Sequence, residues 1–191
     1  MSPPTPPRKR FADWNRRRFL RQGAVLCALA GSLAALSARA TPLPAVRTLR
    51  FVNTHTGETL TAPYHDGNGY CASCLLEVDH FLRDWRNGEV HPIDPALLDI
   101  LYELQSLAHD DAPFEVISGY RSPATNAMLH QRSSGVAEHS QHLLGKAIDV
   151  RLHGYPTRRL SELARSLGCG GVGYYEASDF VHVDTGPVRF W

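Results

Sequence analysis

The chain has 191 residues, of which 43% are hydrophobic and 20% are charged, enough for one ordinary domain with a buried core and a targeting segment. Residues 1–40 carry eight basic residues and one acid, a net charge of +7, whereas residues 41–191 carry twelve basic and eighteen acidic residues, a net charge of −6. A mildly acidic main domain argues against nucleic acid as a natural partner.

Residues 1–40 have the order of an export signal. Arg16, Arg17 and Arg18 precede Phe-Leu, an apolar stretch over residues 23–36 and the tripeptide Ala-Arg-Ala that ends at Ala40. The arginine cluster resembles a twin-arginine signal, which the Tat export machinery reads. The alternative is an uncleaved membrane helix, but the apolar run is shorter than the roughly 20 residues needed to span a bilayer. We therefore predict cleavage after Ala40, a periplasmic domain over residues 41–191 and no stable membrane anchor.

The first half of this domain predicts a hairpin followed by two helices. Two β-prone runs, residues 48–52 and 59–62, flank the polar sequence N-T-H-T-G-E, which is typical of a hairpin. Apolar residues then recur every three or four positions over residues 74–85, as in an amphipathic helix. The second helix should begin with Asp94 as N-cap and Pro95 at the first helical position.

The second half predicts strands that alternate with helices. The elements expected in order are a central strand over 114–118, a helix over 123–130, a polar loop over 131–138 at the rim of a cleft, a helix over 156–167 and a strand over 171–175. This order predicts an α+β fold with helices packed on one face of an antiparallel sheet.

Two further strands carry histidine and carboxylate side chains. In a strand over residues 146–151, Asp149 points away from the face that its apolar neighbours bury, because side chains alternate across a sheet. In a strand over residues 180–184, His182 likewise opposes the buried valines. If these strands pair antiparallel, Asp149 and His182 become neighbours, and the preceding loop brings His142 to them.

This set of groups suits a catalytic zinc ion. Two histidines and one carboxylate leave a fourth coordination position open, whereas structural zinc sites close all four positions, mostly with cysteine. Zinc can lower the pKa of a water ligand to roughly 7 and polarise a carbonyl oxygen, which suits amide hydrolysis. Such a reaction needs a base, and Asp179, three residues before His182, is the predicted general base.

The motif S-x-H-x-x-G-x-A-x-D, from Ser140 to Asp149, and the acid three residues before His182 resemble the zinc superfamily of D-Ala-D-Ala carboxypeptidases and murein endopeptidases. The sequences S-G-Y-R-S, V-G-Y-Y and F-V-H-V-D-T-G are similar to its twin-arginine-exported periplasmic branch, and the similarity covers residues 46–191. The resemblance implies a hedgehog/DD-peptidase-like zinc peptidase fold, with His142, Asp149 and His182 as zinc ligands. Many members have Glu in place of Asp179.

Two further side chains near these motifs have competing interpretations. Arg121, in S-G-Y-R-S, is predicted to grip a carboxylate of a peptidoglycan peptide stem, and the resemblance places it at the active site; the alternative is an ordinary salt bridge. His139 could share a helical face with His142 as a ligand pair. We favour His142 alone, because its spacing to Asp149 matches the motif.

Three cysteines remain after the signal segment. Cys71 and Cys74 form C-A-S-C, which could be a redox pair in an oxidising compartment, and Cys169 stands alone. No thioredoxin-like βαβ pattern surrounds the pair. With three thiols, any disulfide leaves one cysteine unpaired, and the sequence does not fix which.

The leading functional hypothesis is a periplasmic zinc metallopeptidase that hydrolyses peptide cross-links of peptidoglycan during cell-wall growth. The spacing does not distinguish D,D from L,D cross-links, or a murein endopeptidase from a carboxypeptidase. One alternative is a non-catalytic, zinc-containing module that binds the cell wall, against which the presence of Asp179 weighs. Another is a redox protein that depends on Cys71 and Cys74.

Overall fold

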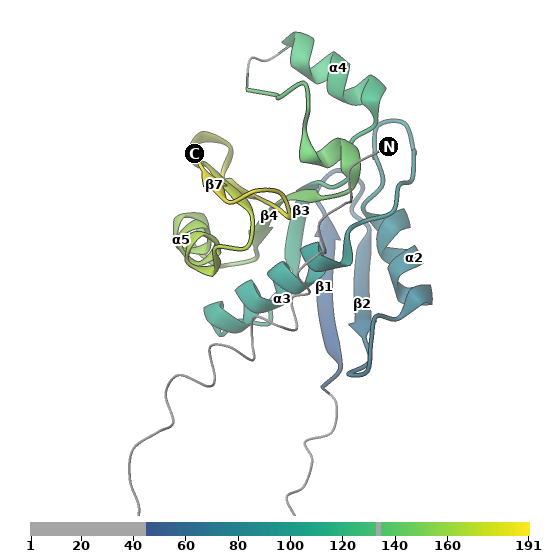
Figure 1. The fold of residues 1–191 in the computed structure, drawn as a ribbon, viewed down its shortest axis with the longest axis vertical. Coiled ribbons are helices and arrows are strands. Elements are labelled where there is room, and N and C mark those ends of the chain that lie inside the picture. The colour runs from purple at the N-terminus through teal and green to yellow at the C-terminus, as the bar shows by residue number, and fades with distance from the viewer. Residues whose placement is uncertain (1–44, 133–134) are drawn as a thin grey trace, which may run out of the picture. The chain divides into compact units, whose positions relative to one another are not determined.

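The computed structural model describes residues 45–132 and 135–191, so the predicted export signal and cleavage site lie outside the described residues, as do two residues of the loop predicted over 131–138. Seven strands form one sheet in the order β2-β1-β3-β4-β6-β5-β7 (Figure 1). The elements are β1 Arg47–Asn53, β2 Thr59–His65, α2 Ala72–Phe81, α3 Pro95–Ala108, β3 Phe114–Ser118, α4 Pro123–Arg132, the 3-10 turn η1 Gln141–Leu144, β4 Ala147–Leu152, α5 Thr157–Leu167, β5 Gly171–Tyr175, η2 Glu176–Ser178, β6 Phe180–Asp184 and β7 Arg189–Phe190.

The sheet is mixed, which corrects the expectation of a purely antiparallel sheet within the α+β class. Strands β1 and β3 pair in parallel, as do β5 and β7, while the other neighbouring strands are antiparallel. The chain between β1 and β3 includes a hairpin strand and two helices. A connection of that length allows the chain to re-enter the sheet in the same direction.

Helices α3 and α5 cover one face of this sheet. They contact each other, and both contact β4, so they lie on the same side. In Figure 1, α3 lies across β1 and β3. The fully buried leucines of these helices and the buried Phe51 and Phe114 of the strands belong to the hydrophobic core. The opposite face of β4 and β6 is free to carry polar groups, which is where the site lies.

The predicted helices form with small changes at their ends. Helix α3 begins as expected, since the carboxylate of Asp94 accepts a hydrogen bond from the backbone at the start of the helix and Pro95 occupies its first position. Helix α2 ends at Phe81, four residues earlier than predicted. The reason is tertiary: the buried carboxylate of Asp84 accepts hydrogen bonds from the backbone N–H groups of Arg86 and Ser122, which holds the following turn outside the helix. Within the described residues, no helix is long and apolar enough to cross a membrane.

Gly119 joins β3 to the site through a close contact between backbones. The N–H of Tyr120 donates to the carbonyl of Leu82 at 2.8 Å. A Cβ atom at position 119 would lie 2.5 Å from that carbonyl oxygen and 2.9 Å from the Cβ of Leu82. Only glycine therefore permits the approach that positions Arg121, two residues further along the chain.

We predict that Gly119→Ala destabilises the domain, because a methyl group forced into a filled space typically raises the free energy of the folded state by about 1–3 kcal/mol. The melting temperature should fall by about 2–4 °C per kcal/mol in a domain of this size. Gly69→Ala is the matched control, since nothing lies within 4 Å of a Cβ atom there. Equal melting temperatures for the two variants in differential scanning calorimetry would contradict the prediction.

Candidate metal centre

The antiparallel pairing of β4 with β6 places Asp149 directly opposite His182. On the buried face of the same two strands, Ile148 lies opposite Val183 and Val150 lies opposite Val181. Because side chains alternate, Asp149 and His182 project together from the other face. The predicted pairing and facing of the two strands are confirmed.

A short 3-10 turn, η1, brings His142 to the same point. Its N-cap, Ser140, accepts a hydrogen bond from the His142 N–H at 3.3 Å, and the turn ends at Gly145, whose φ is 62°. A side chain at Gly145 would also collide with the backbone carbonyl of Pro92. Glycine at position 145 thus allows the turn to pack against the backbone of Pro92. The side chain of His142 points into the protein interior, and 2% of the residue's surface is exposed.

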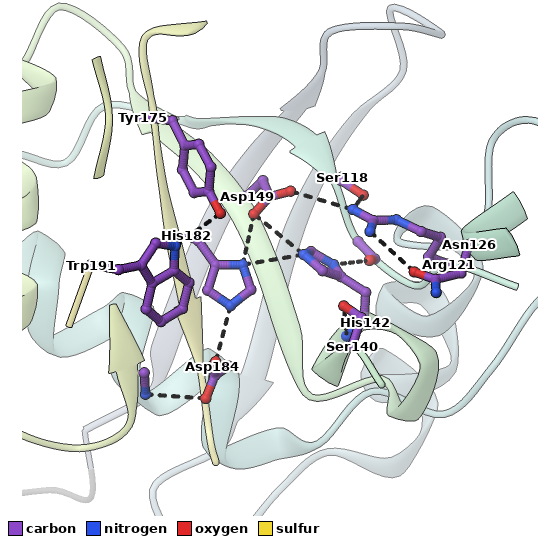
Figure 2. A network of polar contacts seen from close by, with 12 residues as sticks. Ser118, Arg121, Asn126, Ser140, His142, Asp149, Tyr175, His182, Asp184 and Trp191 are labelled. Carbon is purple, nitrogen blue, oxygen red and sulfur yellow. Dashed lines mark hydrogen bonds and ion pairs between the residues drawn. The ribbon is translucent and has the colours of Figure 1, made fainter. Parts of the chain in front are cut away.

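The three side chains converge on one point (Figure 2). The Nδ1 atom of His182 lies 2.9 Å from Oδ1 of Asp149, and Nε2 of His142 lies 3.3 Å from the same oxygen. The two ring nitrogens are 3.2 Å apart. All three residues are buried, and their ligand atoms lie within 4.8 Å of one another.

The outer ring nitrogens are held by acceptors, which fixes the tautomers. Nδ1 of His142 lies 2.7 Å from the carbonyl oxygen of Gly119, and Nε2 of His182 lies 3.0 Å from a carboxylate oxygen of Asp184. In the neutral form of each ring these acceptors favour the N–H on the outer nitrogen, which leaves the lone pair of the inner nitrogen directed into the cluster. Two lone pairs and a carboxylate oxygen at such distances require a proton or a cation between them. The residues therefore fit a metal ion.

The local charges also favour a cation. Burial alone would raise the pKa of Asp149, but attraction and hydrogen bonds from His142 and His182 lower it below its ordinary value. Burial alone would lower the pKa of His182, but hydrogen bonds and charges from Asp149 and Asp184 raise it to about 9. Burial lowers the pKa of His142, which favours its neutral ring, the form that binds a metal ion. A bound metal ion would supply the positive charge that the raised pKa of His182 otherwise assigns to a proton.

Arg121 lies beside this cluster, as predicted. One guanidinium nitrogen is 3.7 Å from Oδ2 of Asp149, and the other contacts, to Ser118 and Asn126, are 3.5 and 3.4 Å long. Its buried Nε has no hydrogen-bond partner among the described residues. Arg121 therefore makes the ion pair of the simpler interpretation and still has donor capacity for a ligand.

A cavity of about 310 Å³ opens above the cluster. Its wall includes residues 135–137 and 139–141, the adjoining ends of β5 and β6, and Trp191. His139 lies on this wall, outside the three convergent residues. Among the described residues that line the cavity, Asp149 is the one with a carboxylate side chain. Asp179, the predicted general base, does not line it.

The structure does not bring Asp179 to the cluster, contrary to the sequence-based expectation. Asp179 follows η2 in the left-handed conformation, with φ of 50°. One carboxylate oxygen accepts a hydrogen bond from Thr157 at 2.5 Å, and the other lies 3.4 Å from a guanidinium nitrogen of Arg151. Asp179 lines a different surface depression, together with these two residues. The turn at Asp179 directs its carboxylate away from the metal cluster. Strand alternation cannot predict this direction, because the residue lies outside a strand.

Several residues at the site were assigned no function from the sequence. Asp184 orients His182 and is itself bound by Arg189 at 2.6 Å. Its position two residues after His182 on one strand was a usable signal, because both side chains share a face. Tyr175 and Trp191 line the cavity and are hydrogen-bonded to each other. Trp191 reaches the site through the pairing of β7 with β5, for which the sequence has no local pattern.

The cysteines lie apart from the cavity. Cys71 and Cys74 form a disulfide at the start of α2, where Cys71 is the N-cap. Cys169 is a free thiol, and burial raises its pKa to about 11. Neither the disulfide nor the free thiol lines the cavity above the metal cluster.

For the metal-dependent peptidase that the sequence motifs predict, Asp179→Asn should retain metal and most activity, with less than about a tenfold fall in kcat, because its carboxylate faces Thr157 and Arg151. Metal content, melting temperature and turnover should be measured on one preparation. Removing a general base typically lowers the rate by roughly 10² to 10⁴. A loss of that size with metal still bound would restore Asp179 as the base and imply a change in this turn during the reaction.

The family model described as Peptidoglycan L,D-endopeptidase MepK matches residues 41–191. A relative with that name in Escherichia coli is 44% identical over 180 residues, covering 94% of this chain and 98% of the relative, and the Shigella flexneri protein gives the same values. The probable peptidoglycan L,D-endopeptidase MepK of Haemophilus influenzae is 43% identical over 185 residues, covering 95% and 97% of the two chains. The resemblance inferred from the motifs is confirmed: the chain belongs to the peptidoglycan L,D-endopeptidase MepK family.

Proposed function

We propose that this protein is a zinc metallopeptidase that hydrolyses L,D peptide cross-links of peptidoglycan in the periplasm. The observation that carries the proposal is the convergence of His142, Asp149 and His182 on one point below a cavity. The names of the relatives support a peptidoglycan substrate and the L,D type of bond. They also favour an endopeptidase over the carboxypeptidase alternative.

Zinc is the metal that best suits this donor set. Nε2 of His142, Nδ1 of His182 and a carboxylate oxygen of Asp149 would hold it, with a fourth position left open. When bound, zinc would lower the pKa of a water ligand to roughly 7 and polarise a carbonyl oxygen. Gly119 and Asp184 would keep the two imidazole rings in the orientation that binding requires.

Arg121 would bind the carboxylates of the substrate. Its hydrogen bonds within the protein are long, at 3.4 and 3.5 Å, and its Nε has no partner among the described residues. Peptide stems of peptidoglycan are rich in carboxylates, and a guanidinium can hold a carboxylate through two parallel hydrogen bonds. The loop over residues 119–122 would therefore have two functions. The backbone carbonyl of Gly119 would hold His142, and the side chain of Arg121 would orient the substrate.

The location follows from the substrate. Peptidoglycan lies outside the cytoplasm, so the enzyme must be exported, and residues 1–40 supply a signal of the twin-arginine type ahead of a catalytic domain over 41–191. We further propose that the domain has the hedgehog/DD-peptidase-like fold. The mixed sheet and the position of the cluster at the β4–β6 pair are the observations that support it.

The purified domain should bind about one zinc ion and split L,D-cross-linked muropeptide dimers into monomers. Alanine in place of His142, Asp149 or His182 should abolish stoichiometric zinc binding and cleavage, because each substitution removes one of three ligands. Elemental analysis gives the metal content, and mass spectrometry of the digest identifies the bond that is cut. D,D-cross-linked dimers test the bond type in parallel.

His139→Ala is the matched control, since His139 lies on the cavity wall but outside the cluster and should leave zinc binding intact. Full zinc content in the triple alanine variant would refute the site. Release of single terminal residues would indicate a carboxypeptidase, and binding of dimers without cleavage would indicate a cell-wall binding module.

Export should fail when Arg16, Arg17 and Arg18 are all changed to Lys, because the twin-arginine receptor recognises arginines rather than charge. Cell fractionation followed by immunoblotting measures the periplasmic share. A periplasmic share equal to that of the unmodified protein would indicate general secretion instead. The lysine variant keeps the net charge of the segment, so a difference between the two proteins cannot come from charge alone.

A further inference from the structure

Tyr175 lies on the cavity wall and has no part in the metal cluster. It ends β5, which pairs with β6 so that Gly173 lies opposite His182 and Tyr175 lies opposite Phe180. Tyr175 is therefore on the same face of the sheet as His182, displaced by two residues along the strand, or roughly 7 Å. Its ring stacks on Phe180 with centroids 4.5 Å apart and an interplanar angle of 18°, which holds the phenol in place.

Trp191 orients the Tyr175 hydroxyl group. The backbone of Trp191 continues the β5–β7 pairing, since its N–H donates to Val172 and its carbonyl accepts from Tyr174. Its indole fills the space over Gly173, where a Cβ atom would lie 2.6 Å from the indole nitrogen. The indole ring is 5.3 Å from the ring of His182, between centroids. Because residue 173 is glycine, the indole of Trp191 can pack directly on the backbone there.

The hydrogen bond between these residues occupies one lone pair of the phenolic oxygen and leaves its proton unused. The indole N–H is a donor only, and it donates to the Tyr175 oxygen at 2.9 Å. Among the described residues this is the one hydrogen bond of the Tyr175 hydroxyl, so its own proton is free for an acceptor in the cavity. Figure 2 shows the hydroxyl oxygen between the indole and the Asp149–His182 pair.

We propose that Tyr175 donates this hydrogen bond to the carbonyl oxygen of the scissile peptide bond as negative charge develops there, and that Trp191 is the residue that positions it. The inference rests on the proposed peptidase function. Hydrolysis adds water across the C–N bond and releases an acid and an amine, while the phenol keeps its proton throughout. A donor held by the folded protein before the substrate arrives needs no reorganisation during the reaction, which makes such donors effective.

Tyr175→Phe keeps the aromatic stack and removes only the donor. We expect kcat to fall by roughly 10²- to 10³-fold with little change in KM, because removing one such donor typically has this effect. Zinc content and melting temperature should stay at their wild-type values. Calorimetric titration with a phosphinate analogue of the L,D bond should show affinity reduced by a similar factor, since that analogue resembles the charged transition state.

Trp191→Phe tests the positioning role without touching the phenol. It removes the indole N–H while keeping an apolar ring over Gly173, so kcat should fall by about tenfold or more, and less than for Tyr175→Phe. In the double variant, the Trp191 change should add no further loss, because both substitutions act through the same hydroxyl group. Additive losses would show that Trp191 acts by another route and would overturn its assigned role.

Tyr174→Phe is the matched control. Tyr174 lies opposite Val181, one residue along β5, and therefore belongs to the other face of the sheet. This variant should match the wild type in kcat and in phosphinate affinity. Wild-type turnover and phosphinate affinity in Tyr175→Phe would overturn the inference alone. Absence of cleavage by the wild-type protein would instead refute the proposed function, so the two failures are distinguishable.

Discussion

The site depends on the register between β4 and β6. Asp149 and His182 are partners across these strands, and the apolar pairs Ile148–Val183 and Val150–Val181 are their alternating neighbours. A slip of one residue would turn every side chain to the opposite face. Exposing the four apolar side chains would lower the free energy of unfolding by roughly 1.5–3 kcal/mol each. The total is comparable to the whole free energy of unfolding of a typical domain, roughly 5–15 kcal/mol. The hydrophobic core therefore fixes the geometry of the metal ligands.

The same physics explains which parts of the site could be predicted from sequence. Strand alternation placed Asp149 and His182 on one face, because it is a local regularity of the chain. His142 was selected by its spacing within the motif shared with the resembling family. Asp179 could not be placed in this way, since a single left-handed residue turns its carboxylate toward Thr157.

The fold shows the same division between local and distant causes. The start of α3 follows from Asp94 and Pro95, which act within one helical turn. The end of α2 depends on Asp84 binding the backbone of Ser122, 38 residues away, and no local pattern encodes that contact. The parallel placement of β7 is equally non-local, because a strand of two residues has no periodicity to detect. Regular segments were thus predictable, and features that arise from tertiary hydrogen bonds were not.

Strand β7 links the two sides of the cavity although it is the shortest of the strands in the described part of the chain. Arg189 binds the buried carboxylate of Asp184, which holds the ring of His182. Two residues later, Trp191 holds the hydroxyl of Tyr175. The two-residue strand makes few backbone hydrogen bonds, and the ion pair between Arg189 and the buried carboxylate of Asp184 adds a side-chain contact that ties β7 to β6. The orientation of one proposed metal ligand and that of the proposed hydrogen-bond donor are therefore coupled through the same short segment.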